Sequence, residues 1–281
     1  MLLGANGLLG SALHRCLGAD PGLEVRRFER NELNLADDSL IGQALGVLEF
    51  DWLVNAAAYT SVDDCEAQPA HADLINGHAP GHIARLCADK GARMIHFSTD
   101  YVFDGKKTEP YTEADEPRPL SAYGRSKLLG EQLVLAASSR HVVLRISWLF
   151  GGGRPAFPEW VLRQAASGPL KVVADKRGCP THAGEAARAT RRLLALRDLS
   201  GGVLHFCHPP ATTWFDYARE ILRLAGRDDA EILPIAMSEL PGLAAPRPDN
   251  SALDVGRCEK LTGQPCRPWR EVLAAHLEGR D

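Results

Sequence analysis

Gly4–Gly10 reads G-A-N-G-L-L-G and stands almost at the start of the chain, with only Met1, Leu2 and Leu3 before it. Its glycines follow the spacing G-x-x-G-x-x-G. Glycine permits a tight turn from a strand into a helix and lets the backbone approach a pyrophosphate closely. The N-terminus of the following helix presents free N–H groups and a partial positive charge to phosphates. The stretch therefore predicts the first βα turn of a dinucleotide-binding fold, with a plain glycine-rich loop as the alternative.

The strand before this loop is unusually short, because a buried strand usually runs about 5–6 residues. Two explanations stay open. Either the strand is as short as residues 1–3 imply, or the natural start of the chain lies upstream of Met1. In the first case we expect the short central strand to reduce the stability of the fold.

From Met1 to about Ser147, short apolar runs alternate with amphipathic segments of helical length. Such alternation predicts parallel strands joined by right-handed crossovers, which is a doubly wound Rossmann sheet of the α/β class. We expect residues 1–150 to form the dinucleotide-binding domain. The predicted strands are 24–28, 52–55, 93–98 and 141–147, and the predicted helices are 8–17, 38–45, 69–90 and 123–137.

A run of glycines and prolines between Gly151 and Pro158 interrupts this pattern. The elements predicted after it are too few and too irregular for a second Rossmann half. We expect residues 151–281 to form a smaller substrate-binding lid, partly interleaved with the core, over the carboxyl ends of the strands, where such folds bind ligands. The helices predicted here are 159–167, 183–196, 214–224 and 269–277, and the strands are 171–174, 203–207 and 231–235.

The composition excludes several classes of protein. The formal net charge of −4 gives no reason to expect nucleic acid as a partner. No apolar run approaches the roughly 20 residues of a membrane span, and no signal peptide opens the chain. The seven cysteines are odd in number and irregularly spaced. They predict reduced thiols in the cytoplasm, with neither a disulfide framework nor a metal site.

The choice of nicotinamide cofactor depends on the end of the second predicted strand, about 20 residues after the glycine loop. Glu29 there would suit a ribose 2′-hydroxyl, whereas Arg30 would suit a 2′-phosphate. We favour NADPH on the strength of Arg30, and NADH stays open. The alternative is that both side chains are ordinary solvated charges.

Tyr123 and Lys127 lie four positions apart at the start of a predicted helix. Residues with this spacing share one helical face, so the phenol and the ammonium group can converge on one substrate. A tyrosine with a pKa near 10 is a poor acid or base at neutral pH, and a nearby cation stabilises its phenolate. The same spacing also occurs by chance on surface helices.

Three hydrogen-bonding side chains, Ser98, Thr99 and Asp100, follow the predicted strand 93–98. The carboxyl ends of parallel strands are where ligands bind in such sheets. Ser98 and Thr99 can polarise a substrate carbonyl, and Asp100 can anchor a hydroxyl or adjust the tyrosine. Simple turn chemistry is the alternative for Ser98 and Thr99.

On these residues the chain resembles the extended short-chain dehydrogenases, and more narrowly the dTDP-4-dehydrorhamnose reductase family. The resemblance covers nearly the whole chain. Ser98–Gly105 reads S-T-D-Y-V-F-D-G, which is the longest and most specific match. The others are Gly4–Gly10 (G-A-N-G-Q-L-G in the family), Asn55–Thr60 (N-A-A-A-Y-T), Tyr123–Lys127 (Y-G-x-S/T-K), Arg145–Trp148 (R-T/I-S-W), Asp175–Thr181 (D-Q-x-G-x-P-T) and Arg247–Asp254 (R-P-x-N-S-x-L-D/N).

The resemblance implies reduction of a dTDP-linked 4-keto sugar by NADPH. Tyr123 would protonate the C4 oxygen, Lys127 would bind the cofactor ribose and lower the tyrosine pKa, and Thr99 and Asp100 would assist at the carbonyl. The implied cofactor-binding residues are Gly4, Asn6, Gly7, Leu8, Leu9, Gly10, Arg30, Ala56, Ala57, Ala58, Tyr59, Ser98, Tyr123 and Lys127. The implied substrate-binding residues are Val62, Thr99, Asp100, Tyr101, Phe103, Trp148, Arg247 and Ser251.

Two departures from the family pattern stand out. Leu8 replaces a glutamine in the glycine loop, and Lys176 replaces a glutamine near the expected substrate, which leaves the sugar open. Two alternatives remain: an epimerase or dehydratase that holds its NAD tightly, and a cofactor-binding regulatory subunit similar to the beta subunit of methionine adenosyltransferase. The family includes dimers, so a homodimer is one of the oligomeric states that stay open.

Overall fold

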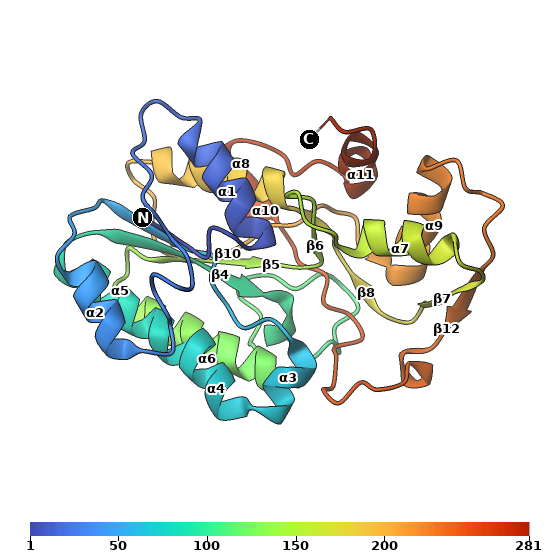
Figure 1. Cartoon of the computed structure of the whole chain (residues 1–281), viewed down its shortest axis with the longest axis horizontal. Helices are drawn as coiled ribbons and strands as arrows, with labels where there is room; N and C mark the ends of the chain where they lie inside the picture. The colour runs from blue at the N-terminus through green and yellow to red at the C-terminus, as the bar shows by residue number, and fades with distance from the viewer. Residues whose placement is uncertain (281) are drawn as a thin grey trace.

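A six-stranded parallel sheet forms the centre of the molecule, in the computed structural model that describes residues 1–280 (Figure 1). Its strand order is β10-β5-β4-β3-β1-β2, which confirms the predicted doubly wound α/β fold. The strands are β1 (Leu2–Leu3), β2 (Arg27–Phe28), β3 (Trp52–Asn55), β4 (Arg93–Thr99), β5 (Val142–Ile146) and β10 (Gly202–His205).

Helices cover both faces of this sheet. On one face, α1 (Leu8–Gly18) lies against α8 (Ala183–Ala195). On the other face lie α2 (Asp38–Gly46), α5 (Ala79–Asp89) and α6 (Ala122–Ala137). Each face has its own apolar core, because the side chains of a strand alternate between its two faces.

Strand β1 shows this alternation in its shortest form. It has only two residues, and Leu2 belongs to the core under α1 and α8 while Leu3 belongs to the core under α2 and α5. Fully burying one leucine stabilises a fold by about 1.5–3 kcal/mol. The amino group of Met1 donates to the carbonyl of Trp52 at 2.7 Å, which extends the pairing by one residue.

The helix predicted over residues 69–90 is interrupted in the structure. It consists of α4 (Pro69–Asp73), a π-helical turn η1 (Leu74–His78) and α5. Pro80 has no N–H group and cannot donate to the carbonyl of Asn76 four residues earlier, which favours the wider turn. A short helix, α3 (Val62–Ala67), precedes this segment.

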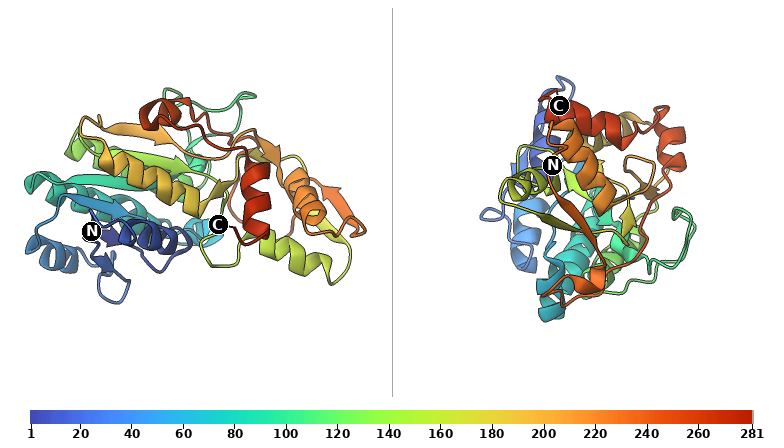
Figure 2. Two further views of the ribbon diagram at one scale, coloured as in Figure 1. Left: turned by 90° about the horizontal axis from the view of Figure 1, so that it is seen from above. Right: turned by 90° about the vertical axis from the view of Figure 1, so that its right-hand side faces the viewer.

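The chain after Phe150 builds a second, smaller core beyond one end of the sheet, as Figure 2 shows. Its elements are α7 (Phe157–Ala165), β7 (Leu170–Val173), α9 (Trp214–Leu224), β12 (Ile232–Ile235) and α11 (Trp269–Leu277). Helix α8 and strand β10, although they come later than Phe150, return to the Rossmann sheet. The two halves of the chain are thus interleaved.

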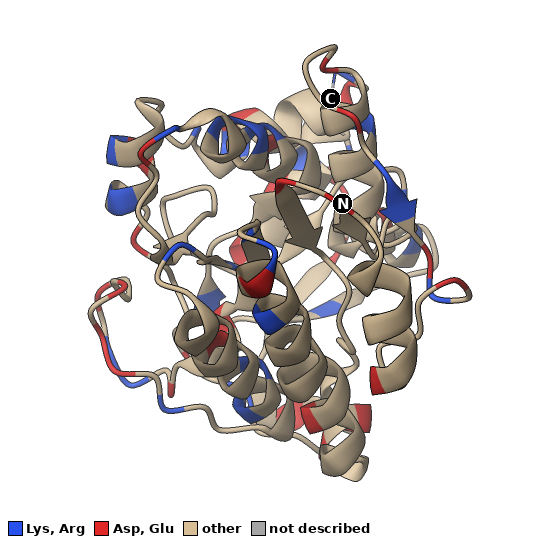
Figure 3. Ribbon diagram, turned by 90° about the vertical axis from the view of Figure 1, so that its left-hand side faces the viewer, with Lys and Arg blue, Asp and Glu red and all other residues tan. Residues whose placement is uncertain are grey.

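The remaining elements are short. They are β6 (Leu149–Phe150) paired with β9 (Thr181–His182), β8 (Arg177–Gly178) paired with β11 (Thr212–Thr213), the 3-10 helices η2 (Asp100–Val102) and η3 (Met237–Glu239), and α10 (Gly256–Thr262). Acidic and basic residues are interspersed on the side of the molecule that Figure 3 shows. Within residues 1–280, no helix is both long and apolar enough to cross a membrane.

Candidate active site

The end of strand β4 and the start of helix α6 bring the predicted catalytic residues together. Thr99 ends β4, Asp100 begins η2, and Tyr123 lies in the first turn of α6. The Ser121 hydroxyl caps α6 by accepting from the N–H of Gly124. A side chain at Gly124 would lie 2.2 Å from the carbonyl oxygen of Tyr101, so only glycine allows α6 to approach η2 this closely.

Tyr123 lies against Tyr101, with ring centroids 5.8 Å apart and the rings nearly perpendicular. Burial raises the pKa of the Tyr123 phenol, the Thr99 hydroxyl offsets part of that rise, and the charge of Asp100 adds to it. The phenol therefore stays protonated at neutral pH and can act as a proton donor.

Lys127 lies one turn further along α6 and is almost wholly buried. Its ammonium group donates to the carbonyl of Phe97 at 2.7 Å and lies 3.4 Å from Nε2 of His96. Burial lowers the pKa of Lys127 to about 8. The family resemblance implied that Lys127 lowers the pKa of Tyr123. In this structure burial raises the pKa of Tyr123 and Lys127 is bonded to strand β4, so the role that the resemblance implies for Lys127 stays a prediction.

Thr99 and Asp100 form a buried hydrogen-bonded group with Ser251. The Thr99 hydroxyl donates to Oδ1 of Asp100 at 3.1 Å, and the Ser251 hydroxyl donates to Oδ2. Burial raises the pKa of Asp100, while these two hydroxyls and the charge of Lys176 oppose that rise. The structure thus joins Ser251, which comes from the far end of the chain, to two predicted catalytic residues.

The glycine loop forms a close backbone turn before α1. Gly4 has a φ of +75°, and a Cβ on Gly10 would lie 1.9 Å from the carbonyl oxygen of Gly4. Gly7 is the N-cap of α1, and neither a side-chain cap nor an acidic residue occupies its first turn. The N–H groups at this helix end are therefore available to an anion.

Beside this loop lies a cavity of about 250 Å³. The predicted residues Gly4, Asn6, Gly7 and Arg30, together with Ala56–Tyr59, line it. Leu8, Leu9 and Gly10 continue from the loop into α1. Besides Leu3 and Phe28 of the strands, sequence reasoning missed five lining residues: Leu33, Asn34, Leu35, His71 and Ile75. No motif marks them, because they come from a loop and a helix that only the fold brings to this place.

Asn76 is a second omission, and it fixes the predicted cofactor loop. Its amide accepts from the N–H of Tyr59 at 2.8 Å, donates to the carbonyl of Tyr59 at 2.9 Å, and donates to the Ser126 hydroxyl at 3.1 Å. The loop is thereby tied to helix α6. Pro80, which cannot donate to the carbonyl of Asn76, is a signal in the sequence that could have drawn attention to Asn76.

Ser98 provides a test of whether this region fits a ligand. Its hydroxyl is buried at the end of β4 and has no hydrogen-bond partner among residues 1–280. Buried polar groups in proteins nearly always find a partner. The orphaned hydroxyl, the free helix end and the glycine-lined cavity together suit a dinucleotide with its pyrophosphate at α1.

Arg30 and Glu29 both lie at the edge of this cavity. Arg30 is exposed, whereas Glu29 is partly buried and lies 3.7 Å from the guanidinium of Arg27. Arg30 is therefore the residue of the two with a free charge for a 2′-phosphate.

Trp148 lies at the crossing from the Rossmann core into the second core. It is the one residue other than glycine among residues 1–280 with a positive φ, at +43°. Its indole lies against Gly178, where a Cβ would come within 2.5 Å of the ring, and against Trp214 at 5.8 Å between centroids. Its indole N–H is buried without a partner in that part of the chain. Backbone strain of this kind is typical of functional sites.

Arg247 makes a two-fold ion pair with Asp63, at 2.6 and 3.2 Å. Asp63 also accepts from the N–H groups of Ala244 and Ala245, and these bonds with Arg247 hold its pKa at about 2. The loop that carries Arg247 is thus fastened to helix α3, next to the predicted residue Val62.

Phe103 does not fit its predicted role. The ring is fully buried and stacks on Tyr111, with ring centroids 4.1 Å apart. That burial argues against direct contact with a substrate and gives Phe103 a part in a small core under the loop 104–112.

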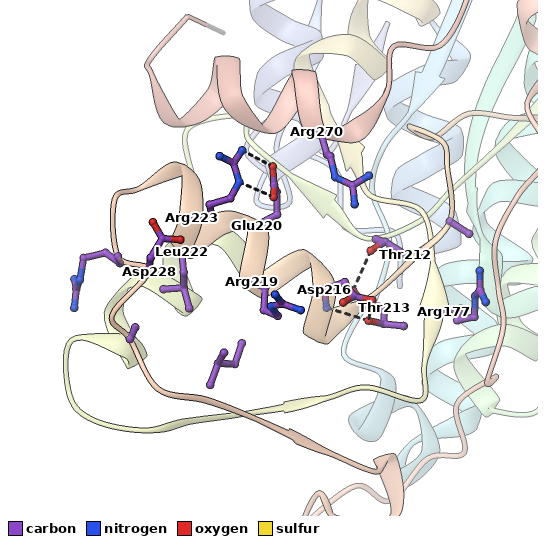
Figure 4. A pocket seen from close by; sticks show the side chains of 14 residues that line it. Arg177, Thr212, Thr213, Asp216, Arg219, Glu220, Leu222, Arg223, Asp228 and Arg270 are labelled. Carbon is purple, nitrogen blue, oxygen red and sulfur yellow. Dashed lines mark hydrogen bonds and ion pairs between the residues drawn. The ribbon is translucent and has the colours of Figure 1, made fainter.

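A second hollow, of about 490 Å³, lies between α9, α11 and β8 (Figure 4). Arg219, Arg223 and Arg270 surround it, with Arg177 at its other end. Arg223 pairs with Glu220 at 2.8 Å. All four arginines are exposed to solvent, and none of the predicted catalytic residues lines this hollow. We therefore regard it as a solvated groove, distinct from the candidate active site.

Comparison with known proteins gives a consistent result. The model of the family described as RmlD substrate binding domain matches residues 1–280. A dTDP-4-dehydrorhamnose reductase of Mycobacterium tuberculosis is 36% identical over 285 residues, covering 99% of this chain and 91% of the relative. A probable dTDP-4,6-dihydroxy-2-methyloxan-3-one 4-ketoreductase of Streptomyces antibioticus is 38% identical over 277 residues, covering 97% and 92%.

Solved structures agree with these relatives. The crystal structure of a dTDP-4-dehydrorhamnose reductase from Bacillus anthracis, in complex with NADP, has a TM-score of 0.91 to this structure. The two chains are 29% identical, and the match covers 99% of this chain and 98% of the other.

Proposed function

The chain belongs to the RmlD substrate binding domain family, and from this we propose that it is an NADPH-dependent reductase of dTDP-4-dehydro-L-rhamnose. The product would be dTDP-L-rhamnose. The observation that carries the proposal is the meeting of Tyr123 with the Thr99–Asp100–Ser251 group at the edge of the sheet where the glycine loop also lies. Relatives named as reductases of dTDP-linked sugars support the same reaction.

The cofactor would lie with its pyrophosphate at the N-terminus of α1. When bound, NADPH supplies the hydride that reduces the sugar. Gly4, Gly7 and Gly10 let the backbone approach the phosphates, and Ala56–Tyr59 form the opposite wall of the cavity. Arg30 would take the 2′-phosphate, which favours NADPH over NADH.

Tyr123 would donate the proton that the C4 oxygen needs as the carbonyl carbon is reduced. Its raised pKa keeps the phenol protonated at neutral pH. Thr99 and Asp100 would orient the carbonyl and the phenol. Lys127 uses one donor on Phe97 and has others left for the ribose hydroxyls.

The sugar nucleotide would lie between the two cores. We assign Trp148, Tyr101 and Val62 to the walls of that space, and Ser251 to the hydrogen bonds that hold Asp100. The guanidinium group of Arg247 can bind a diphosphate through two parallel hydrogen bonds, and in this structure it is paired with Asp63. Substrate binding would then require Arg247 to exchange one anionic partner for another.

Isotope transfer tests the proposed reaction. NADPH carrying deuterium at the transferable position of its nicotinamide is incubated with the protein and dTDP-4-dehydro-L-rhamnose, which an epimerase generates in the same tube. We expect NMR of the product to show deuterium at C4 of the sugar. Deuterium at another carbon, or no deuterated sugar, would contradict the proposed reaction.

Three broader assignments belong to the same proposal. Residues 1–150 would bind the cofactor. Residues 151–281 would supply the substrate region, and their elements α8 and β10 would complete the Rossmann core. The seven cysteines are all free, which suits a protein of the cytoplasm. A homodimer, which the family resemblance leaves open, is tested by light scattering on the purified protein.

A further inference from the structure

Lys176 is a buried cation that the proposed reaction does not yet use. Its side chain is 1% exposed, although lysine is among the residues that proteins almost never bury fully. It lies in the segment before β8, two residues from the Gly178 that supports Trp148. A buried ammonium group loses its hydration, so its neighbours must compensate for that loss.

Three segments surround this ammonium group. It donates to the carbonyl of Pro248 at 3.0 Å. It lies 4.7 Å from the ring centroid of Tyr101 and 5.6 Å from that of Trp214, both within the range of cation–π attraction. Lys176 thus joins the Rossmann core (Tyr101), the second core (Trp214) and the loop that carries Arg247.

Asp100 is the anion on which this cation acts. Within residues 1–280, Asp100 forms no direct ion pair, and Lys176 is the cation whose charge favours its ionised form. Asp100 in turn accepts from Thr99, and Thr99 acts on the Tyr123 phenol. Electrostatic interactions and the Thr99–Asp100 hydrogen bond therefore couple Lys176 to the proposed proton donor.

We propose that Lys176 is a positioning residue whose positive charge keeps Asp100 ionised and thereby holds Thr99 and Tyr123 ready for proton transfer. This inference rests on the proposed function and adds to it a residue at which the chain departs from its family. A glutamine at this position would fill much of the same space but would carry no charge.

Several charged groups face Lys176 and must be counted in its titration. They are Asp100 and Tyr101 from η2, Arg247 and Asp249 from the loop after η3, and Asp175 from its own segment. Burial outweighs the acidic neighbours and lowers the pKa of Lys176 to about 8. Lys127 has a pKa of about 8 for the same reason. Loss of activity above pH 8 could therefore come from either lysine, and a variant must separate them.

The experiment measures kcat and KM for NADPH-dependent sugar reduction between pH 6 and 10. The variants are Lys176→Met, which keeps the length of the side chain without its charge, and Lys176→Arg, which keeps the charge at all these pH values. Lys171→Gln is the matched control, because Lys171 is an exposed lysine on the neighbouring strand β7.

We expect Lys176→Met to lower kcat at pH 7 about tenfold, with a smaller change in KM. Lys176→Arg should restore most of kcat and make the alkaline limb of the profile less steep, because only Lys127 then titrates near pH 8. A side chain that only fills space would leave Lys176→Met close to the wild type. Wild-type kcat and pH profile in Lys176→Met would overturn the inference.

A double-mutant cycle tests the inference even if the larger side chain of Lys176→Arg cannot be accommodated at this buried position. If Lys176 acts through Asp100, Lys176→Met should cost little further activity in an Asp100→Asn background. An equal loss in both backgrounds would overturn the inference.

A measurement without substrate separates this inference from the proposed function. Wild-type protein that does not reduce the sugar contradicts the proposed function alone. Lys176 has a folded-state pKa below the value of about 10.4 in an unfolded chain, so the unfolded state binds more protons between these values. The Tm of the wild type should therefore rise relative to that of Lys176→Met from pH 8 to 10. A Tm difference that does not change with pH would contradict a buried, titrating Lys176.

Discussion

The two ends of the candidate active site are built in different ways. At the cofactor end, backbone and small side chains form an open cavity, and backbone atoms approach one another closely, as they do at Gly4 and Gly10. At the substrate end, buried charges and aromatic rings meet across the molecule. Ser251 and Asp100 are 151 positions apart, and Arg247 and Asp63 are 184 apart.

From this difference we expect the two ends to recognise their ligands through different physics. The cofactor end depends on shape, because a single added methyl group would collide with the backbone. The substrate end depends on the balance of charge around Asp100, Lys176 and Arg247, whose partners can change. We therefore expect substitutions at the cofactor end to affect binding and folding together, and substitutions at the substrate end to change kinetics and pH dependence.

Tyr123→Phe should have the largest effect, because Tyr123 lies where the two ends meet. Removing the proton donor should lower kcat by about 10³-fold, within the range for general acid catalysis. NADPH binding, followed by fluorescence titration, should stay within about twofold of the wild type. A variant that retains more than a tenth of wild-type kcat would show that another group donates the proton.

Gly10→Ala is the second prediction and tests the cofactor end. The added Cβ would lie 1.9 Å from the carbonyl oxygen of Gly4, so the loop must move. We expect loss of NADPH binding and a decrease in the free energy of unfolding of about 3 kcal/mol, measured by denaturant titration.

Gly18→Ala provides the control for this prediction in the same helix. Nothing lies within 4 Å of a Cβ at Gly18, so alanine should be neutral or stabilise α1 by a few tenths of a kcal/mol. Equal NADPH affinity in both variants would show that the glycine loop does not hold the cofactor.

Arg247→Ala is the third prediction and tests the substrate end. Losing the guanidinium should raise KM for the sugar nucleotide by about 30-fold and change kcat less, because a diphosphate contact acts on binding. Arg163→Ala, which removes an exposed arginine of α7, is the control. An unchanged KM in Arg247→Ala would mean that Arg247 serves only the ion pair with Asp63.

The pH dependence of this ion pair follows from the lowered pKa of Asp63, which is about 2. A carboxylate with a depressed folded-state pKa contributes its stabilisation above the unfolded value of about 3.9, and loses it as the pH falls towards 2. Asp63 therefore stays ionised from pH 5 to 8. The pH dependence of KM between pH 5 and 8, measured by steady-state kinetics, should therefore be the same in the wild type and in Asp63→Asn.

Arg30→Ala should have the smallest effect. Arg30 is exposed at the edge of the cavity, and screening by solvent limits what its charge contributes. We expect the ratio of kcat/KM for NADPH to that for NADH to fall about tenfold. Arg26→Ala, which changes an exposed arginine outside the lining of the cavity, should leave the ratio unchanged. A ratio that responds equally to both substitutions would exclude Arg30 as the specific phosphate contact.

The sequence supports predictions about local features better than about distant ones. The strand–helix alternation predicted the doubly wound sheet, and helices such as α9 and α11 lie at their expected bounds. The glycine loop, Tyr123 and the residues at the end of β4 were singled out from local sequence patterns, and their roles stay predictions. The pairing of Arg247 with Asp63 was not predicted, because no local pattern encodes which carboxylate a distant arginine meets. The burial of Phe103 was not predicted either, because no local pattern shows that its ring packs on Tyr111 rather than at the site.

The most direct test follows nicotinamide oxidation by the wild-type protein with dTDP-4-dehydro-L-rhamnose, formed in the same cuvette by an epimerase. NADPH and NADH are compared in parallel. We expect oxidation that requires the sugar, consumes one NADPH for each sugar reduced, and is slower with NADH. Tight NADPH binding without sugar-dependent oxidation would contradict this expectation and indicate a regulatory protein. Conversion of a sugar nucleotide with no net consumption of cofactor would contradict it in favour of an epimerase.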